Sequence, residues 1–128
     1  MRVLALDYGA ARTGVAISDA TGTIARPLDV VERAATDGGI AEVRALVDEH
    51  GAELVVVGMP LTLRGERGAQ ADETEAFVEV LRSVLDVPVE TYDERFTTAI
   101  AARAGGTADE DARAAAHLLE SYLQSVGA

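Results

Sequence analysis

Short apolar runs separated by glycine-containing turns dominate the first part of the chain. Runs of this kind, rich in valine, leucine and isoleucine, are typical of β-strands. Because only short turns join them, each strand is expected to pair with the next one in antiparallel fashion. Asp29 interrupts the third run, which indicates an edge strand. The predicted strands cover residues 3–6, 15–17 and 23–31.

The rest of the chain alternates between helical and strand-like patterns. Gly38 and Gly39 are expected to end the section of strands. Apolar residues then recur at helical spacing over residues 40–50, and a continuous apolar run at 54–58 is typical of a strand buried on both faces of a sheet. The remaining predicted elements are a helix over 74–85, a strand over 88–92, a short helix capped by Thr97 or Thr98, and a final helix from Asp111.

This order of elements predicts an α/β fold in which parallel strands lie at the centre of the sheet and helices cover both faces. In such sheets, ligands bind at the carboxyl ends of the strands. Asp7 ends the first predicted strand, Met59-Pro60 ends the fourth and Asp93-Glu94 ends the fifth. These residues meet at one edge of the sheet if the three strands run in the same direction.

Asp111 is expected on the buried side of the last helix, because Ala115, Leu118 and Tyr122 follow it at helical spacing. A buried carboxylate needs a partner or a cation, since an isolated buried charge is costly. From this position Asp111 can reach the edge at which the strands end. The alternative is that Asp111 and its acidic neighbours only interact with the positive end of the helix dipole.

Length and composition indicate one globular domain spanning residues 1–128, because 48% of the residues are apolar. The chain has no cysteine, which excludes disulfides and thiolate zinc sites, and its two histidines are far apart in sequence and make a poor metal cluster. Polar residues follow position 6 too early for a signal peptide, and no apolar run reaches membrane-spanning length. We therefore expect a cytoplasmic protein without membrane contact.

The net charge of −11 argues against a broad nucleic-acid-binding surface, which is usually basic. All the cationic side chains other than the histidines are arginines, however, and some fall beside predicted loops or strand ends. They form either a local basic pocket on an acidic body or part of an ordinary solvated surface. The arginines concerned are Arg12, Arg64, Arg67 and Arg95.

The turn after the first strand combines a carboxylate, two glycines and an arginine. Asp7 stands at the mouth of the predicted hairpin, and Gly9 and Gly14 allow backbone N–H groups to approach an anionic ligand. Arg12 offers a planar set of donors suited to phosphate. The combination suggests that a metal ion and a phosphate are handled together at this turn.

Four ordered blocks of sequence, spread over nearly the whole chain, resemble the motifs of the YqgF family. This RuvX-like family of bacterial RNase H-like proteins is described as candidate pre-16S ribosomal RNA nucleases and also as candidate Holliday junction resolvases. The blocks are Leu6-Asp7-Tyr8-Gly9 with Arg12, Gly14-Val15-Ala16 and Ser18-Asp19; Val57-Gly58-Met59-Pro60-Leu61 with Gly65; Asp93-Glu94-Arg95 with Thr97-Thr98; and Asp111 with Ala114-Ala115, Leu119 and Ser121-Tyr122-Leu123.

The resemblance implies a single RNase H-like nuclease domain with a five-stranded mixed sheet in the order 3-2-1-4-5. It also implies that Asp7, Glu94 and Asp111 form the acidic active-site cluster. The activity implied is hydrolysis of phosphodiester bonds, in particular during 5′-end processing of pre-16S rRNA. The partner would be structured nucleic acid, either precursor rRNA or branched DNA.

The chemistry of the carboxylates agrees with this assignment, because Mg²⁺ and Mn²⁺ take oxygen ligands. Three carboxylates from distant segments can hold one or two such ions, which activate water and stabilise the leaving oxygen. Arg12 and Arg95 would bind phosphate. The loop containing Arg64 and Arg67 either contacts the substrate backbone or only caps the following helix.

The chain departs from the family pattern in two places. Ala11 replaces a basic residue of many members, and Asp109 stands where many have lysine. Both differences remove positive charge near the predicted site and bear on the strength of nucleic-acid binding.

Two other classes of protein remain as alternatives. The first hairpin also resembles the phosphate-binding hairpin of the sugar kinase, actin and heat-shock ATPase group, although those proteins need two such domains. A non-catalytic RNA-binding factor in ribosome assembly or transcription is the other. The oligomeric state is open between monomer and homodimer, because a resolvase needs two active sites and a single-strand nuclease does not.

Overall fold

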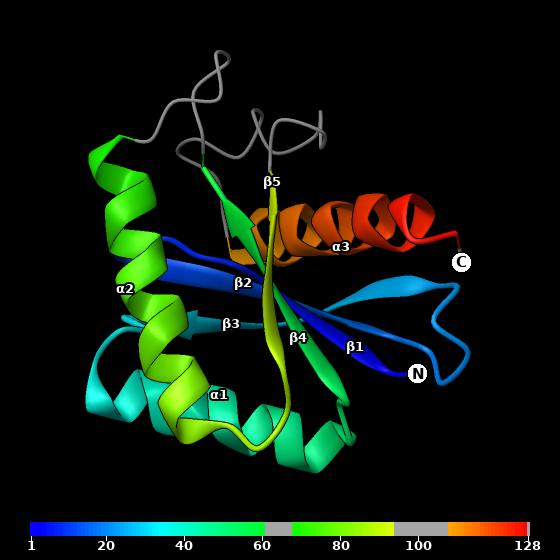
Figure 1. Ribbon diagram of the computed structural model, residues 1–128, viewed down its shortest axis with the longest axis horizontal. Coiled ribbons are helices and arrows are strands. Elements are labelled where there is room, and N and C mark those ends of the chain that lie inside the picture. Colours follow the sequence, from blue (N-terminus) through cyan, green and yellow to red (C-terminus); the bar gives the residue numbers. More distant parts are fainter. Residues whose placement is uncertain (61–67, 94–107, 128) are drawn as a thin grey trace.

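The computed structural model describes residues 1–60, 68–93 and 108–127, which form a five-stranded mixed sheet with helices on both faces (Figure 1). The strand order is β3-β2-β1-β4-β5, which confirms the predicted topology. The strands are β1 (Val3–Asp7), β2 (Arg12–Ser18), β3 (Ala25–Glu32), β4 (Leu54–Met59) and β5 (Val89–Asp93). The helices are α1 (Asp37–His50), α2 (Ala69–Val84) and α3 (Ala108–Ser125).

The strands β1, β4 and β5 run in the same direction, and β2 and β3 pair antiparallel with their neighbours. Leu6 of β1 is level with Val57 of β4, and Met59 of β4 is level with Asp93 of β5. The three parallel strands therefore end at one edge of the sheet, as the sequence predicts. All six residues of β4 are buried, as expected for the strand between β1 and β5.

Alternating side chains of the strands supply two separate cores. Leu4 and Leu6 of β1 pack in the core that includes residues of α1 and α2, whereas Val3 and Ala5 pack in the core that includes residues of α3. Figure 1 shows α3 on the opposite side of the sheet from the other two helices. This period of two determines which residues of each strand can face α3.

The start of α1 shows that the role predicted for Gly38 and Gly39 is wrong. Gly38 and Gly39 lie in the first turn of the helix and do not end the preceding section. Thr36 caps the helix by accepting a hydrogen bond of 3.2 Å from the Gly39 amide. A Cβ atom on Gly39 would overlap the backbone of Arg33 and Ala34, so this glycine allows the preceding turn to pack against the helix.

The strand β2 begins at Arg12, three residues before the predicted start at residue 15. Arg12 is level with Glu32 of β3, and the Arg33 amide donates a 3.0 Å hydrogen bond to the Ala11 carbonyl. Backbone pairing with β3 thus extends the strand beyond its apolar run. The β3 strand lies at the sheet edge, and its register shifts near Asp29, as the polar interruption indicates.

Tyrosine side chains connect β5 to α3. The Tyr92 hydroxyl lies 2.8 Å from the Ser121 hydroxyl, and the Tyr122 hydroxyl donates a 3.0 Å hydrogen bond to a carboxylate oxygen of Glu90. The two tyrosine rings also meet edge to face, with centroids 5.6 Å apart. These contacts fix the end of β5 that leads to the acidic segment at Asp93.

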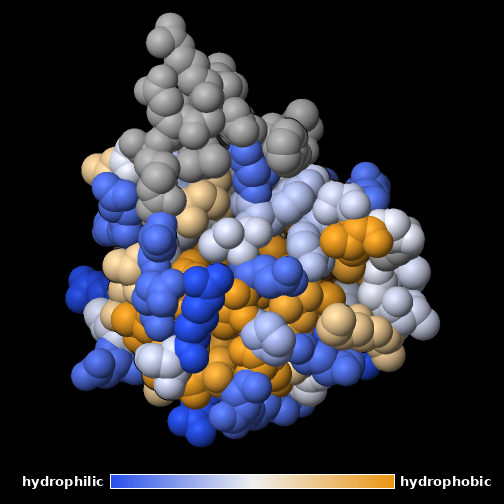
Figure 2. All heavy atoms as spheres, viewed as in Figure 1, coloured by the Kyte–Doolittle hydropathy of each residue, from blue (hydrophilic) through white to orange (hydrophobic). Residues whose placement is uncertain are grey.

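No helix among the described residues has both the length and the apolar character needed to cross a membrane. On the face shown in Figure 2, hydrophobic side chains gather in the middle and hydrophilic ones cover most of the margin. The short helix expected after Thr97 or Thr98 lies outside the described residues.

Candidate functional site

Asp7 occupies the last position of β1 and is 1% exposed. Its predecessors at two-residue spacing, Val3 and Ala5, both pack in the α3 core. The Asp7 side chain is therefore directed to the α3 face of the sheet. Tyr8, the next residue, faces the other core and stacks on Phe77 of α2 with ring centroids 4.5 Å apart. Burial, and secondarily the charge of Glu73, raises the pKa of Tyr8.

Asp111 lies in the first turn of α3 and is 6% exposed. The helix begins at Ala108, so Asp111 is both close to the positive helix end and on the buried face. Ala115 and Leu118 are fully buried on the same side, and Tyr122 is partly buried. The prediction that Asp111 lies on the buried side of the helix is confirmed. Because Asp111 also lies in the first turn, it can interact with the positive end of the helix dipole as well, and the two interpretations are compatible.

Gly14 brings these two carboxylates to one place. It is the direct cross-strand partner of Asp7. A Cβ atom on Gly14 would overlap the carbonyl oxygen of Asp111 and lie 3.2 Å from the Ala112 amide nitrogen. The helix backbone thus rests on β2 where the side chain is missing. Gly14 makes room for α3, which corrects the expectation that it leaves room for an anionic ligand.

Arg12 forms an ion pair with Asp111, with 2.7 Å between Nε and Oδ2. Arg12 and Gly14 are two residues apart on β2, so the Arg12 side chain lies on the face of the sheet where Gly14 contacts α3. The Asp111 side chain is 8% exposed, whereas that of Arg12 is 38% exposed. The guanidinium therefore lies between a buried carboxylate and the solvent.

Thr13 closes the hairpin that carries the site, and its role was not predicted from the sequence. Its hydroxyl is 3.3 Å from both the amide nitrogen and the carbonyl oxygen of Gly9. The first bond is donated by the amide and the second by the hydroxyl. The position of Thr13 between Arg12 and Gly14 in the motif is the sequence signal from which this role could have been predicted. The hydrogen bonds fix the spacing between Asp7 and Arg12 across the turn.

Asp19 stabilises the turn at the other end of β2. Its carboxylate accepts hydrogen bonds from the backbone amides of Thr23 and Ile24, at 2.8 and 3.0 Å, and from the Thr21 hydroxyl. The bond from the Ile24 amide is the largest cause that lowers the pKa of Asp19 well below its ordinary value of 3.8, followed by the other two. This member of the first sequence motif is therefore a turn residue.

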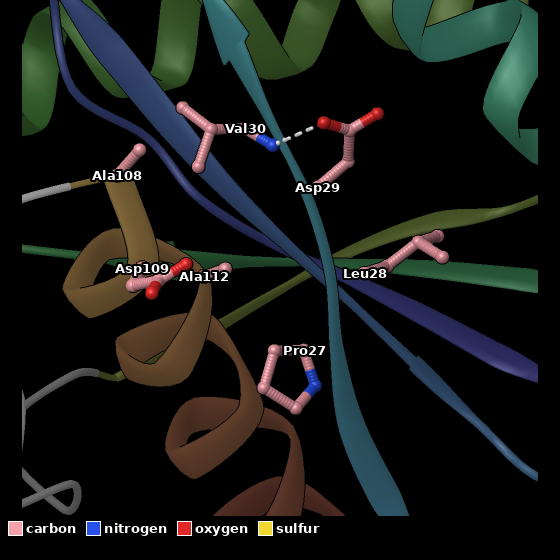
Figure 3. A pocket seen from close by; sticks show the side chains of 7 residues that line it. All are labelled: Pro27, Leu28, Asp29, Val30, Ala108, Asp109 and Ala112. Atoms are coloured by element: carbon pink, nitrogen blue, oxygen red, sulfur yellow. Dashed lines mark hydrogen bonds between the residues drawn. The ribbon is translucent and has the colours of Figure 1, made fainter.

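A hollow of about 350 Å³ lies beside the first turns of α3 (Figure 3). It lies between the first turns of this helix and part of the edge strand β3, and Asp109 lines it on the helix side. The Asp29 carboxylate accepts a hydrogen bond of 2.7 Å from the Val30 amide on the strand side. The hollow is lined by residues 27–30, Ala108, Asp109 and Ala112. The residue that departs from the family pattern thus adds negative charge next to the candidate site.

The donor chemistry fits a divalent cation. Asp7 and Asp111 provide carboxylate oxygens on one face of the sheet, and oxygen is the ligand atom that Mg²⁺ and Mn²⁺ prefer. The described residues contain no cluster of three histidine or acidic side chains able to hold a metal. Glu94, the third carboxylate of the predicted set, follows β5 outside the described residues.

The structure therefore brings together Asp7, Asp111 and Arg12 among the predicted site residues. Asp93, the last residue of β5, lies at the same edge of the sheet. The other predicted residues, namely Glu94, Arg95, Arg64 and Arg67, lie outside the described residues.

The architecture is that of the RNase H-like fold. The structure of Thermus thermophilus RuvC in complex with a Holliday junction substrate matches with a TM-score of 0.60 and 22% identity, covering 100% of this chain and 98% of that chain. The fowlpox virus resolvase in its complex with Holliday junction DNA matches with a TM-score of 0.59 and 13% identity, covering 100% of both chains. At these identities the likeness establishes the fold.

The chain belongs to the RuvX family, whose sequence model, described as "Holliday junction resolvase", matches residues 1–125. A relative from Chloroflexus aurantiacus is 43% identical over 132 residues, covering 96% of this chain and 86% of the relative. One from Desulforudis audaxviator is 40% identical over 134 residues, covering 98% and 95%. Both are named "Putative pre-16S rRNA nuclease". The resemblance to the YqgF and RuvX family is confirmed.

Proposed function

We propose that this protein is a metal-dependent nuclease that hydrolyses phosphodiester bonds in structured nucleic acid, with pre-16S rRNA as its substrate. The observation that carries the proposal is the pair of buried carboxylates, Asp7 and Asp111, held on one face of the sheet by the close contact at Gly14. The names of the curated relatives support the choice of ribosomal RNA. The cytoplasmic location expected from the sequence is part of the same proposal.

Asp7, Asp111 and Glu94 are the proposed metal ligands, with Mg²⁺ or Mn²⁺ as the ion. Bound there, one or two such ions supply an activated water and stabilise the charge on the leaving oxygen. The chain itself positions the reaction: burial excludes bulk water from Asp7 and Asp111, and Thr13 fixes the hairpin that carries Asp7. No side-chain nucleophile takes part in this proposal.

Arg12 is the proposed phosphate-binding residue, since its partly exposed guanidinium stands next to the buried carboxylates. Arg95, Arg64 and Arg67 remain predicted contacts to the substrate backbone. Such contacts position nucleic acid without reading its sequence. Shape and the accessible strand would therefore select the substrate.

Cleavage of branched DNA is the second candidate function, favoured by the description of the family model as a Holliday junction resolvase. It makes a different demand on assembly, because two strands must be cut by two active sites. Side-by-side cleavage of a structured pre-16S RNA and a four-way DNA junction, by one preparation with Mg²⁺ or Mn²⁺, distinguishes the two. Sedimentation of the same preparation decides between monomer and dimer.

Substituting Asp7→Asn or Asp111→Asn tests the site. Each change removes a ligand charge at nearly constant size, so cleavage should fall by orders of magnitude, since each 1.4 kcal/mol of lost transition-state stabilisation is about tenfold in rate. Single-turnover cleavage measures the rate, and fluorescence anisotropy without divalent ions measures binding, which should persist. Asp48→Asn, an exposed carboxylate on α1, is the matched control and should cleave normally. If Asp7→Asn cleaves as fast as the unmodified protein, the non-catalytic RNA-binding function replaces this proposal.

A further inference from the structure

Arg12 provides a positive charge next to the buried Asp111. The contact is made by Nε, one edge of the guanidinium, at 2.7 Å from Oδ2. A carboxylate with 8% of its side chain exposed needs a compensating charge, because burial of an isolated charge is costly. Arg12 supplies that charge.

The position of Arg12 follows directly from the packing at Gly14. Arg12 precedes Gly14 by two residues and shares its face of β2. The α3 backbone rests on Gly14, and this contact brings the Asp111 side chain next to the Arg12 side chain. The pair is thus built into the contact between strand and helix.

A divalent cation coordinated by Asp111 would compete with this ion pair. Both the cation and the guanidinium are attracted to the same carboxylate, and their like charges repel at such short distances. The Arg12 side chain is 38% exposed and long, so it can turn outward when the carboxylate is taken. Turned outward, the guanidinium would be available to a phosphate of bound nucleic acid.

We propose that Arg12 is an internal counter-ion that occupies Asp111 in the metal-free protein, is displaced when a divalent cation binds, and then binds the substrate phosphate. This inference rests on the proposed function and gives Arg12 two successive partners. It makes metal binding and nucleic-acid binding cooperative through one side chain. By linkage, each ligand then raises the affinity for the other by the same factor.

Calorimetric titration of Mn²⁺ into the metal-free protein tests the competition. Arg12→Met removes the competing charge and should bind Mn²⁺ about fivefold more tightly or better, the lower end of typical coupling between sites. Arg113→Met removes an exposed arginine from α3 and should leave the affinity unchanged, so it controls for general electrostatics. Equal or weaker Mn²⁺ binding by Arg12→Met overturns the proposal.

Nuclear magnetic resonance of the unmodified protein tests the displacement without any substitution at the site. The Arg12 Nε–H resonance, assigned by its loss in Arg12→Lys, reports the ion pair of this group with Asp111. Saturating Mg²⁺ should shift this resonance and speed its exchange with water. If the resonance stays unchanged in saturating Mg²⁺, Arg12 remains paired with Asp111 when the ion is present, and the proposal is wrong. This experiment also decides the matter if Arg12→Met does not fold.

Nucleic-acid binding measures the cooperative step. Anisotropy of a labelled precursor RNA, with Ca²⁺ in place of Mg²⁺, should show that the cation strengthens binding by the unmodified protein about fivefold or more. Arg12→Met should lose most of this gain. An equal gain in both proteins contradicts the second role of Arg12. These readouts are independent of cleavage, so a protein that binds metal and RNA without cutting refutes the proposed function and leaves the counter-ion role intact.

Discussion

At the scale of single residues, the candidate site depends on the absence of one side chain. Gly14 pairs with Asp7 across the sheet and lies against the Asp111 carbonyl. Any larger residue must push α3 away from β2, because the atoms that it meets belong to the backbone. The glycine therefore controls the distance between two carboxylates from opposite ends of the chain.

Gly14→Ala should destabilise the fold by about 3 kcal/mol, the upper range for overpacking a well-packed interior. Urea unfolding followed by circular dichroism measures the free energy of unfolding. Gly38→Ala is the matched control, since a Cβ atom there has no neighbour within 4 Å and alanine suits a helix better than glycine. That variant should be neutral or slightly more stable. A Gly14→Ala protein of unchanged stability would contradict the close packing described for α3 and β2.

At the scale of elements, α3 has two tasks. Its first turn carries Asp111, and its last turns hold β5 through Ser121 and Tyr122. Burial, followed by the hydrogen bond to Glu90 and the charge of Glu90, raises the pKa of Tyr122 to about 12. One helix thus positions both a site carboxylate and the strand that leads to Asp93.

The raised pKa of Tyr122 predicts a loss of stability at high pH. In the unfolded chain this hydroxyl ionises near its ordinary pKa of 10.0, and in the folded chain near 12. Between these values the folded state binds more protons, so the stability contributed by Tyr122 is present below pH 10 and decreases as the pH rises. Urea unfolding at pH 7, 9 and 11 should show a smaller decrease for Tyr122→Phe.

The Tyr122→Phe variant should also lose about 1 kcal/mol at pH 7, the usual contribution of one hydrogen bond. Glu90→Gln is the control for the carboxylate, and it should reduce the pH dependence while keeping the tyrosine. A Tyr122→Phe protein with the same pH dependence as the unmodified chain would show that the loss at high pH comes from other groups. Tyr8, whose pKa is also raised, is the first of these.

At the scale of the whole molecule, the net charge of −11 works against nucleic-acid binding. Asp109 adds a further negative charge in the first turn of α3, where it lines the hollow (Figure 3). A divalent cation at the site would offset part of this repulsion. We therefore expect binding to depend strongly on both salt and divalent ions.

Asp109→Lys should strengthen nucleic-acid binding several-fold at low salt and increase its salt dependence, because it replaces a phosphate-repelling charge beside the candidate site by a phosphate-attracting one. Glu120→Lys makes the same charge change at an exposed position farther along α3 and should have a smaller effect. Anisotropy at several salt concentrations gives both slopes. Equal effects of the two substitutions would mean that net charge alone, and not the position of Asp109, governs binding.

Divalent metal should stabilise the folded chain by mass action, since the proposed ligands come together only on folding. Millimolar Mg²⁺ or Mn²⁺ should therefore raise the melting temperature measured by scanning fluorimetry. Asp111→Asn should lose most of this increase, whereas Asp48→Asn should keep it. A melting temperature that does not respond to either ion would exclude Asp7 and Asp111 as a metal site.

Local patterns were sufficient to predict most of the fold. Strand and helix periods depend on residues that are near in sequence, so the five strands, the helices α1, α2 and α3 and the buried side of Asp111 followed from spacing. Boundaries that depend on pairing were less accessible. The start of β2 at Arg12 requires the partner strand, and the place of Gly38 and Gly39 within α1 depends on the cap at Thr36.

By itself, the sequence determined the class of fold, the edge of the sheet at which Asp7 and Asp93 lie, and the residue types available to the candidate site. The tertiary structure alone decided that Gly14 receives the backbone of α3 and that Arg12 is paired with Asp111. Arg12 and Asp111 are far apart along the chain, and only the packing of α3 on β2 brings them to 2.7 Å. A contact of this kind depends on the relative position of two elements, which no local spacing encodes.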